Sequence, residues 1–333
     1  MKTYLFDIGH PAHVHYFKDA IKSLKKNNKV IVVARNKDMT FDLLQKFDID
    51  FISRGKGFNG LVNKFFYLIY AVAKILIISR SDKVDRIVGF GSPYAAISSR
   101  FKRADNVIFT DTEHAYLSYK LYKPFTDHII INKYYNRTIE SNKLRITRLS
   151  GFFEEIYLSE IKQNKIRHHQ KKVLFRIIDW NAHHDVGYSG LKDHHLVDIV
   201  TQISHFSDVY ISSESDIPEC LKDFKINVNS DTMHEFMSTL DLYIGESLTM
   251  GVEACLLGVP AIVVSETANL LGNASAMINH DIMRIENTIE KIPALAKVMF
   301  QNKQRYENIA ENIWRESDCV KSEIFDIIKI DNL

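Results

Sequence analysis

The sequence contains few cysteines and almost no excess of charge. Its three cysteines, Cys220, Cys255 and Cys319, are odd in number and far apart in a chain of 333 residues, which argues against a disulfide framework and fits a reducing cytoplasm. The 43 Lys and Arg residues nearly balance the 41 Asp and Glu residues, for a net charge of +2. Composition therefore gives no electrostatic case for a nucleic-acid partner.

The sequence also lacks an apolar run long enough to cross a membrane. The N-terminus, MKTYLFDIGHPAH, reads as a strand followed by a turn, and Asp7 interrupts its apolar residues, so we expect no signal peptide and a cytoplasmic location. The most apolar stretch, Leu61–Arg80, has an unbroken apolar run only over Phe65–Ala73. We expect a buried helix there. The alternative is that residues 54–80 contact the inner face of a membrane or a lipid acceptor.

What the sequence does contain is a regular alternation of short β-rich runs with amphipathic segments. The predicted strands are Tyr4–Ile8, Val30–Ala34, Asp50–Ile52, Arg86–Phe90, Val107–Thr110 and His128–Ile131, then Val173–Ile178, Asp208–Ser212, Ile226–Val228, Leu242–Ile244 and Ala261–Val264. This order predicts an α/β fold with parallel, doubly wound sheets.

A polar segment without strand signals separates the two series of strands. The chain is therefore expected to form an N-terminal Rossmann-like domain over residues 1–150, a linker over 151–172 and a C-terminal Rossmann-like domain over 173–333. The two domains are expected to face one another across a cleft. The helical stretch from Ile289 onward can pack back on the first domain.

The stretch Gly245–Val264, GESLTMGVEACLLGVPAIVV, joins a strand end to a helix and a new strand. Ser247 and Thr249 can cap the helix, which is expected over Met250–Leu257, and Gly258 ends it. The N-terminus of this helix then points to the carboxyl end of a strand, where unpaired N–H groups and the helix dipole favour a phosphate group.

A second turn, GHPAHVHYFK, follows the first predicted strand, and Gly9 and Pro11 shape its entry into a helix. A neutral imidazole at His13 could take a proton from an acceptor hydroxyl. His10 and His15 are weaker candidates for this role. A histidine at the start of a helix is also often only a cap.

Two more polar segments follow predicted strands. Asp111 and Glu113 lie just past Val107–Thr110, and the segment DWNAHHDVGYSG contains the three candidate contacts to a diphosphate or a donor sugar, His183, His184 and Asp185. Adjacent histidines rarely point to one metal centre, no third spaced ligand is evident, and Asp111 stands before a threonine and a glutamate rather than in a DxD motif, so we expect no metal and no cofactor.

Four of these segments, DIGHPAHVHYFK, FTDTEHA, DWNAHHD and GESLTMGVEACLLGVPAI, resemble the GT-B superfamily, and the likeness extends over nearly the whole chain. This superfamily includes nucleotide-sugar glycosyltransferases and the non-hydrolysing UDP-N-acetylglucosamine 2-epimerases. The sequence is more similar to an uncharacterised GT-B-like family associated with surface-polysaccharide genes.

The resemblance implies roles for individual residues. It implies that the C-terminal domain binds the nucleotide, that Glu253 accepts hydrogen bonds from ribose hydroxyls, and that His13 lies beside the sugar. The remaining contacts that it implies are those of Gly9 and His10 in the first loop and of Gly245, Glu246, Ser247, Thr249 and Met250 around the diphosphate. Glu113 matches an essential glutamate of the epimerases. Asp111 and Glu113 have three open roles, which are to orient His13, to bind the acceptor, or to form a plain charged loop pair.

The chain departs from the epimerase pattern at two places. An epimerase is expected to have an arginine in the first loop and an acid after the fourth main strand, where this sequence has His10–Pro11 and Gly89–Ala96. We therefore predict a metal-independent glycosyltransferase that moves a sugar from a nucleotide sugar, UDP-linked, to a glycan or lipid-linked acceptor in polysaccharide biosynthesis. The alternatives are an epimerase-like enzyme and a non-catalytic nucleotide-sugar binding protein.

Overall fold

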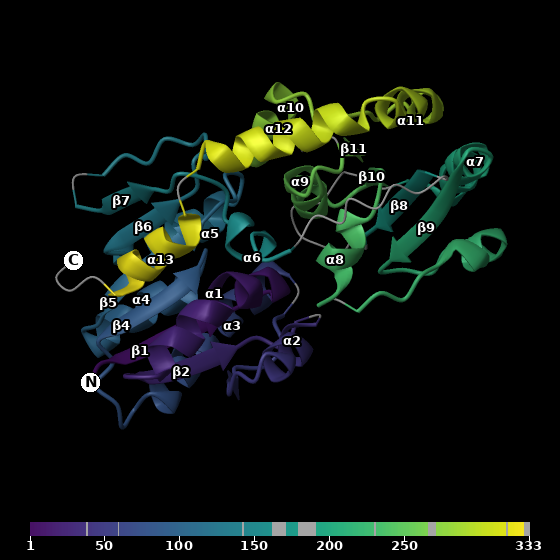
Figure 1. The fold of residues 1–333 in the computed structure, drawn as a ribbon. Coiled ribbons are helices and arrows are strands. Elements are labelled where there is room, and N and C mark those ends of the chain that lie inside the picture. The colour runs from purple at the N-terminus through teal and green to yellow at the C-terminus, as the bar shows by residue number, and fades with distance from the viewer. Residues whose placement is uncertain are drawn as a thin grey trace. The chain divides into compact units, whose positions relative to one another are not determined.

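The computed structural model describes residues 1–333 except for 38, 59, 142, 162–170, 179–190, 230, 266–270, 318 and 330–333, and except for the side chain of residue 61. The chain divides into two compact units (Figure 1). Unit 1 consists of Met1–Tyr157 and Asp318–Leu333, and unit 2 consists of Leu158–Ser317. Each unit is described by itself.

Unit 1 is built on a seven-stranded sheet with the strand order β3-β2-β1-β4-β5-β6-β7, in which every neighbouring pair is parallel. Its strands are β1 (Thr3–Ile8), β2 (Lys29–Ala34), β3 (Ile52–Ser53), β4 (Arg86–Phe90), β5 (Asp105–Thr110), β6 (His128–Ile131) and β7 (Arg145–Arg148). The order reverses between β1 and β4, so the carboxyl ends of these two strands form the topological switch point, where ligands bind in open α/β sheets.

Most helices of unit 1 lie in the crossovers between successive strands. They are α1 (Pro11–Lys25), α2 (Thr40–Lys46), α3 (Leu61–Ile78), α4 (Pro93–Lys102), α5 (Tyr116–Tyr122), the 3₁₀ helix η1 (Lys123–Phe125), α6 (Glu155–Leu158) and α13 (Val320–Lys329). Because right-handed crossovers on the two sides of the switch point cover opposite faces of the sheet, α1 and α2 lie on one face and α3, α4 and α5 on the other. The contacts between α3 and α4 and between α4 and α5 agree with this arrangement.

The last helix, α13, packs in unit 1 although it follows unit 2 in the sequence (Figure 1). The guanidinium of Arg86 in β4 donates a hydrogen bond of 2.6 Å to the carbonyl of Ile328, and Lys321 pairs with Asp19 of α1 at 2.7 Å. Within the segment expected to be a linker, Gly151–Tyr157 belongs to unit 1 and is buried.

Unit 2 contains a five-stranded parallel sheet with the order β12-β11-β10-β8-β9. Its strands are β8 (Lys171–Ile177), β9 (Ser207–Ser213), β10 (Leu242–Gly245), β11 (Ala261–Val263) and β12 (Met283–Ile285). Its helices are α7 (Asp193–Ser204), η2 (Glu219–Phe224), α8 (Met233–Ser238), α9 (Leu248–Leu256), α10 (Gly272–Asn279), η4 (Ile289–Lys291), α11 (Ile292–Phe300) and α12 (Lys303–Arg315). The order reverses between β8 and β10, which places a second switch point at their carboxyl ends.

The two parallel sheets confirm the predicted α/β fold class, and the differences concern short elements. Ile226–Val228 was predicted as a strand, but this prediction is wrong: the described contact there is an isolated bridge between Ile211 and Lys225. The edge strands β7 and β12 were not predicted. Their sequences, RITR and MRI, are only four and three residues long, which is too short for a strand pattern to stand out from their surroundings.

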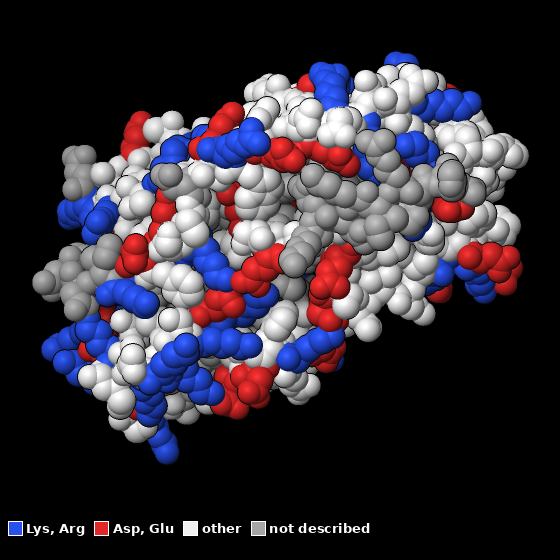
Figure 2. All heavy atoms as spheres, in the orientation of Figure 1, with Lys and Arg blue, Asp and Glu red and all other residues white. Residues whose placement is uncertain are grey.

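Helix α3 is not the buried helix that the apolar sequence predicts. Its inner side, with Tyr67, Ala71 and Ile75, is buried against unit 1, while its outer side carries exposed apolar residues such as Phe65 and Phe66. No helix in the described parts of the chain combines the length and the apolar character that crossing a membrane requires. On the face drawn in Figure 2, Lys and Arg side chains lie among Asp and Glu side chains, in line with the near-zero net charge.

Candidate functional site

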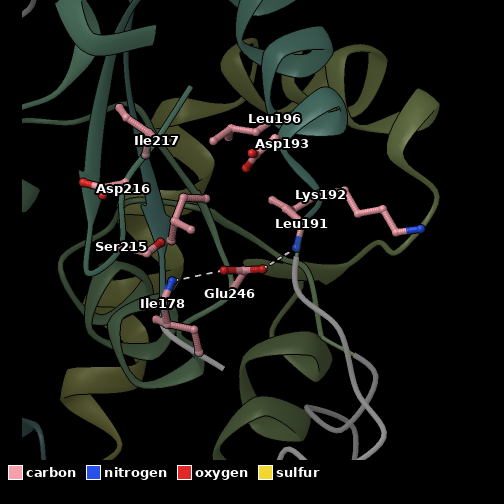
Figure 3. A pocket seen from close by; sticks show the side chains of 10 residues that line it. Ile178, Leu191, Lys192, Asp193, Leu196, Ser215, Asp216, Ile217 and Glu246 are labelled. Atoms are coloured by element: carbon pink, nitrogen blue, oxygen red, sulfur yellow. Dashed lines mark hydrogen bonds between the residues drawn. The ribbon is translucent and has the colours of Figure 1, made fainter. Parts of the chain in front are cut away.

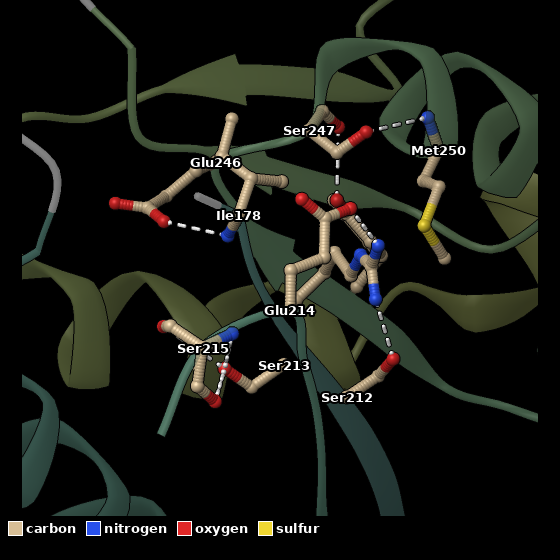
Figure 4. A network of polar contacts seen from close by, with 10 residues as sticks. Ile178, Ser212, Ser213, Glu214, Ser215, Glu246, Ser247 and Met250 are labelled. Carbon is tan, nitrogen blue, oxygen red and sulfur yellow. Dashed lines mark hydrogen bonds and ion pairs between the residues drawn. The ribbon is translucent and has the colours of Figure 1, made fainter. Parts of the chain in front are cut away.

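The turn from β10 into α9 lies at the switch point of unit 2. The Ser247 hydroxyl is the N-cap of α9 and accepts a hydrogen bond of 3.4 Å from the N–H of Met250, while the Tyr243 hydroxyl donates one of 2.8 Å to the carbonyl of Ser247 (Figure 4). Ser247 therefore has the capping role predicted for it. The helix begins at Leu248, before Thr249, so Thr249 lies in its first turn rather than at the cap.

Two glycines let the backbone of this turn approach its neighbours closely. A Cβ atom on Gly245 would lie 2.6 Å from the carbonyl oxygen of Arg176 in β8, and one on Gly251 would lie 2.9 Å from a methyl group of Val263 in β11. Both distances are too short for a real Cβ contact. The glycines thus hold the start of α9 against the ends of the central strands, which fixes the position of its N-terminal N–H groups.

Glu246 directly follows β10 and contacts the backbone at the same switch point. Its buried carboxylate accepts hydrogen bonds from two backbone N–H groups, that of Ile178 at 3.0 Å and that of Leu191 at 2.6 Å (Figure 3). These residues flank the segment 179–190 in the sequence, so Glu246 holds Ile178 and Leu191 close to one another. His183, His184 and Asp185 belong to this segment and lie outside the described residues.

A pocket of about 280 Å³ opens beside Glu246 (Figure 3). It is lined by Ile177, Ile178, Leu191, Lys192, Asp193, Leu196, Ser215, Asp216, Ile217 and Glu246, which come from the ends of β8, β9 and β10 and from the start of α7. Three of these side chains are carboxylates and one is a lysine. Carboxylates accept hydrogen bonds, so the pocket suits a partner that offers hydroxyl or N–H groups better than it suits a phosphate.

Arg176 contacts the neighbouring strand β9 at the same switch point. Arg176 in β8 donates a hydrogen bond of 2.8 Å to Ser212 and pairs with Glu214, both of which belong to β9 or directly follow it (Figure 4). Because Glu214 offsets the charge of the guanidinium, Arg176 organises the strand ends and does not add a net positive charge for a phosphate.

The carboxylate predicted to bind ribose, Glu253, is buried in the second turn of α9 and has a histidine partner. Its Oε1 lies 3.2 Å from Nε2 of His234 in α8, whose side chain is also largely buried. The pair links the helix that starts at the switch point to the helix that precedes β10. The sequence interpretation did not find His234.

In unit 1, the turn after β1 leads into α1 much as the sequence predicts. His10 is the N-cap of α1, since its Nδ1 accepts a hydrogen bond of 3.2 Å from the N–H of Ala12, and Pro11 is the first helical residue. The N–H of Gly9 donates a hydrogen bond of 3.2 Å to Nδ1 of His13, and the imidazole of His13 stacks on the ring of Phe90 at the end of β4, with 4.8 Å between centroids.

The surroundings of His13 keep its imidazole neutral. Burial lowers the pKa of His13 well below its usual value of 6.5, and electrostatic interactions with His10, Lys37 and Arg54 lower it further. A backbone N–H can only donate, so Nδ1 of the neutral ring has no proton and Nε2 carries it. His13 therefore presents an N–H donor at Nε2. His15, the weaker candidate, is buried against Phe47 and Tyr157.

A buried ion pair lies at the end of β1, next to the turn that leads into α1. Asp7 of β1 accepts hydrogen bonds from Nε of Arg54 at 2.7 Å and from the hydroxyl of Ser92, the N-cap of α4, at 2.5 Å. Arg54 also donates to the hydroxyl of Tyr67 at 2.6 Å. The carboxylate thus joins the end of β1 to residues that directly follow β3, at the edge of the sheet, and β4, the neighbour of β1 at the switch point of unit 1.

Asp111 and Glu113 follow β5. Burial, and secondarily the charge of Glu113, raise the pKa of Asp111 to about 6, although the Thr112 hydroxyl donates a hydrogen bond of 2.8 Å to it. The buried Glu113 carboxylate accepts a hydrogen bond of 3.1 Å from the N–H of Asn136. In the sheet β4 lies between β1 and β5, so two strand spacings, about 10 Å, separate the end of β5 from the end of β1, after which α1 begins and carries His13.

Within the described residues, no group of three or more His, Cys, Asp or Glu side chains is arranged to hold a metal ion.

A family model described as "Protein of unknown function (DUF354)" matches residues 2–315. The chain belongs to the DUF354 family. A search of curated proteins finds no match for this DUF354 chain.

Solved structures share the fold of this DUF354 chain at low identity. The S. aureus MnaA–UDP co-structure has a TM-score of 0.74 at 11% identity and covers 99% of this chain and 96% of that one. The UDP-GlcNAc 2-epimerase from Neisseria meningitidis bound to UDP-GlcNAc has a TM-score of 0.71 at 14% identity, with 98% and 100% covered. MurG from Acinetobacter baumannii has a TM-score of 0.65 at 15% identity, with 99% of each chain covered.

These likenesses confirm the resemblance that the motifs predict: the DUF354 chain has a GT-B-like fold built from two Rossmann-like units. Its structure brings together the predicted residues from Gly245 to Glu253 on one turn and helix. It also adds four residues that the sequence did not single out for the sites, namely Asp7, Arg54, Arg176 and His234.

Proposed function

We propose that this protein is a glycosyltransferase that transfers a sugar from a nucleoside-diphosphate sugar, UDP-linked, to a glycan or lipid-linked acceptor. The observation that carries the proposal is the turn at the switch point of unit 2, where the capped N-terminus of α9 lies between the ends of β8 and β10. A helix N-terminus at this place in an α/β sheet suits a diphosphate.

The parts of the nucleotide sugar would use different groups of unit 2. The first N–H groups of α9 would take the diphosphate and stabilise its charge as it leaves. Glu253 would accept hydrogen bonds from ribose hydroxyls, and the pocket lined by Asp193, Asp216 and Glu246 would take a part of the substrate that offers hydroxyl groups. Two of the similar structures were solved with UDP or UDP-GlcNAc, which supports a uridine nucleotide.

Unit 1 would act on the sugar and the acceptor. The Gly9–His13 hydrogen bond favours His13 as a donor through Nε2 to the transferred sugar or its phosphate over a role as the base. Asp111 suits the base better, because a carboxyl group with a pKa of about 6 is largely ionised at neutral pH and still accepts a proton readily. The reaction would need no bound metal.

A second candidate is a UDP-N-acetylglucosamine 2-epimerase-like activity. The carboxyl pair Asp111 and Glu113, with the pKa of Asp111 raised to about 6, favours this activity. Acid–base chemistry at a carbon centre needs one ionised group that accepts a proton and one protonated group that donates it. The TM-score of 0.71 to the Neisseria meningitidis epimerase, above that of 0.65 to MurG, points in the same direction.

One experiment separates the two activities. The full chain would be incubated with UDP-GlcNAc and other nucleotide sugars in D₂O, with and without glycan acceptors, and followed by NMR. A transferase should release UDP only slowly without an acceptor, faster with one, and leave the hydrogen at C2 of the sugar in place. Deuterium at C2 without an acceptor would instead identify an epimerase, since epimerisation there must break the C–H bond.

Two controls complete the experiment. Excess EDTA should leave turnover unchanged, and a loss restored by a divalent cation would contradict the metal-independent mechanism. Calorimetry with each nucleotide sugar measures binding without turnover. Binding with neither transfer nor exchange would indicate a non-catalytic binding protein, and the absence of binding to every nucleotide sugar would overturn the proposal as a whole.

A further inference from the structure

The outer side of α3 is apolar, although it faces away from the core of unit 1. Its exposed residues Val62, Phe65, Phe66, Ile69, Tyr70 and Ile77 recur at spacings of three and four, as regularly as the buried Tyr67, Ala71 and Ile75 on the inner side. The side chains of Phe65 and Phe66 are each 61% exposed. A helix on a soluble surface normally presents polar residues there, so a second apolar stripe requires a partner.

The neighbouring helices extend this apolar surface. Phe101 at the end of α4 and Tyr116, Leu117 and Leu121 on α5 are also exposed, and α4 contacts both α3 and α5. Among the described residues, Val298 is the one exposed large apolar side chain that belongs to unit 2. The exposed apolar residues therefore gather in unit 1, and most of them lie on one face of its sheet.

The charges of these helices are all of one sign. The residue ranges of α3, α4, α5 and η1 contain no Asp or Glu, and they contain six basic residues, Lys64, Lys74, Arg100, Lys102, Lys120 and Lys123. This contrasts with the chain as a whole, in which basic and acidic residues are nearly balanced. Exposed aromatic and aliphatic residues with interspersed lysines are the composition of a surface that rests on anionic lipid headgroups.

We propose that the outer face of α3, α4 and α5 docks on the surface of a membrane that contains anionic lipids. The apolar stripe enters the boundary between headgroups and acyl chains, and the lysines lie among the headgroup charges. A second copy of this chain fits less well, because its basic helices would meet helices of the same charge. The proposal does not depend on the enzymatic function, and its test needs no nucleotide sugar.

The test measures the partition of the full chain onto vesicles by co-sedimentation. Vesicles of phosphatidylcholine with phosphatidylglycerol should bind the protein, those of phosphatidylcholine alone should bind it far less, and salt should release it. Lys64→Gln and Lys120→Gln should each weaken binding about fivefold. The double variant Phe65→Ser/Phe66→Ser should weaken it by at least about tenfold.

Matched controls come from unit 2. Val298→Ser removes an apolar side chain that is 56% exposed, and Lys222→Gln removes an exposed lysine, so both should leave vesicle binding unchanged. An unchanged melting temperature identifies the variants that remain folded, since every substituted side chain is exposed. The proposal is overturned if the protein ignores anionic vesicles, binds neutral vesicles equally well, or loses no binding in the α3 and α5 variants. It is also overturned if the protein ignores vesicles and sedimentation shows a dimer that Phe65→Ser/Phe66→Ser dissociates.

Discussion

The backbone N–H of Gly9 donates a hydrogen bond of 3.2 Å to Nδ1 of His13. This contact decides which ring nitrogen carries the proton, because a backbone N–H offers no acceptor. With Nδ1 occupied as an acceptor, the free Nε2 is a donor and has no lone pair with which to take a proton. The sequence alone suggested a base or a direct ligand of the transferred sugar at this position, and the hydrogen bond favours the second of these roles.

The first prediction is that His13 stays a neutral imidazole protonated on Nε2. Ring ¹H–¹⁵N correlations should show this tautomer at neutral pH, and the ring should remain neutral below pH 6.5, since burial and neighbouring positive charges lower its pKa. His13→Ala should lower turnover by about 10²–10³-fold, the loss expected for one donor to a developing charge. His13→Gln keeps an N–H donor and should restore part of the activity. A proton on Nδ1, or full activity of His13→Ala, would contradict this role.

The second prediction concerns Asp111 and pH. Its pKa is raised to about 6 in the folded protein from 3.8, so the folded state holds this proton more tightly than the unfolded state does. The free energy of unfolding should therefore fall as pH rises from about 4 to 6, by up to about 3 kcal/mol from this group, and this contribution should level off above pH 6. Asp111→Asn should remove that part of the pH dependence, measured by urea unfolding between pH 4 and 7.

The third prediction, which also concerns Asp111, is the pH dependence of catalysis. If Asp111 is the base, it must be ionised to act, so turnover should rise with pH through about 6. Asp111→Asn should lower turnover by about 10²–10⁴-fold and abolish this rise. An Asp111→Asn variant with wild-type turnover would transfer the role of base to another residue.

Local features of the sequence were predictable, and contacts between distant residues were not. Ser247 and Gly258 were found because capping depends on residues a few positions apart, and Gly258 indeed has a positive φ of 80°. The sheets were found because strand periodicity is also local. The pair Asp7–Arg54 joins residues 47 positions apart, and its sequence signal is no more than a charged residue that interrupts an apolar strand.

The fourth prediction tests the close approach between Gly245 and β8 at the switch point of unit 2. Gly245→Ala would place a Cβ 2.6 Å from the backbone oxygen of Arg176, which cannot move without distorting β8. The free energy of unfolding should fall by about 3 kcal/mol, at the upper end of the cost of overpacking. Gly91→Ala is the matched control, because nothing lies within 4 Å of its Cβ and only its φ of +52° opposes the change. It should cost about 1 kcal/mol. Equal costs in urea unfolding would show that the contact with β8 is not what requires a glycine.

The last prediction separates two roles for Glu253, as the carboxylate that binds ribose and as the structural partner of His234. Glu253→Ala should weaken UDP binding by about 1–3 kcal/mol in calorimetry without unfolding the chain, because a carboxylate that accepts from two hydroxyls forms charge-assisted bonds. His234→Gln keeps a donor for Glu253 and should leave UDP affinity nearly unchanged. If the pair is only structural, both variants should lower the free energy of unfolding, and the UDP affinity of the folded protein should stay the same in both. Because the two side chains lie 3.2 Å apart and are both largely buried, the comparison changes one partner at a time within a single contact.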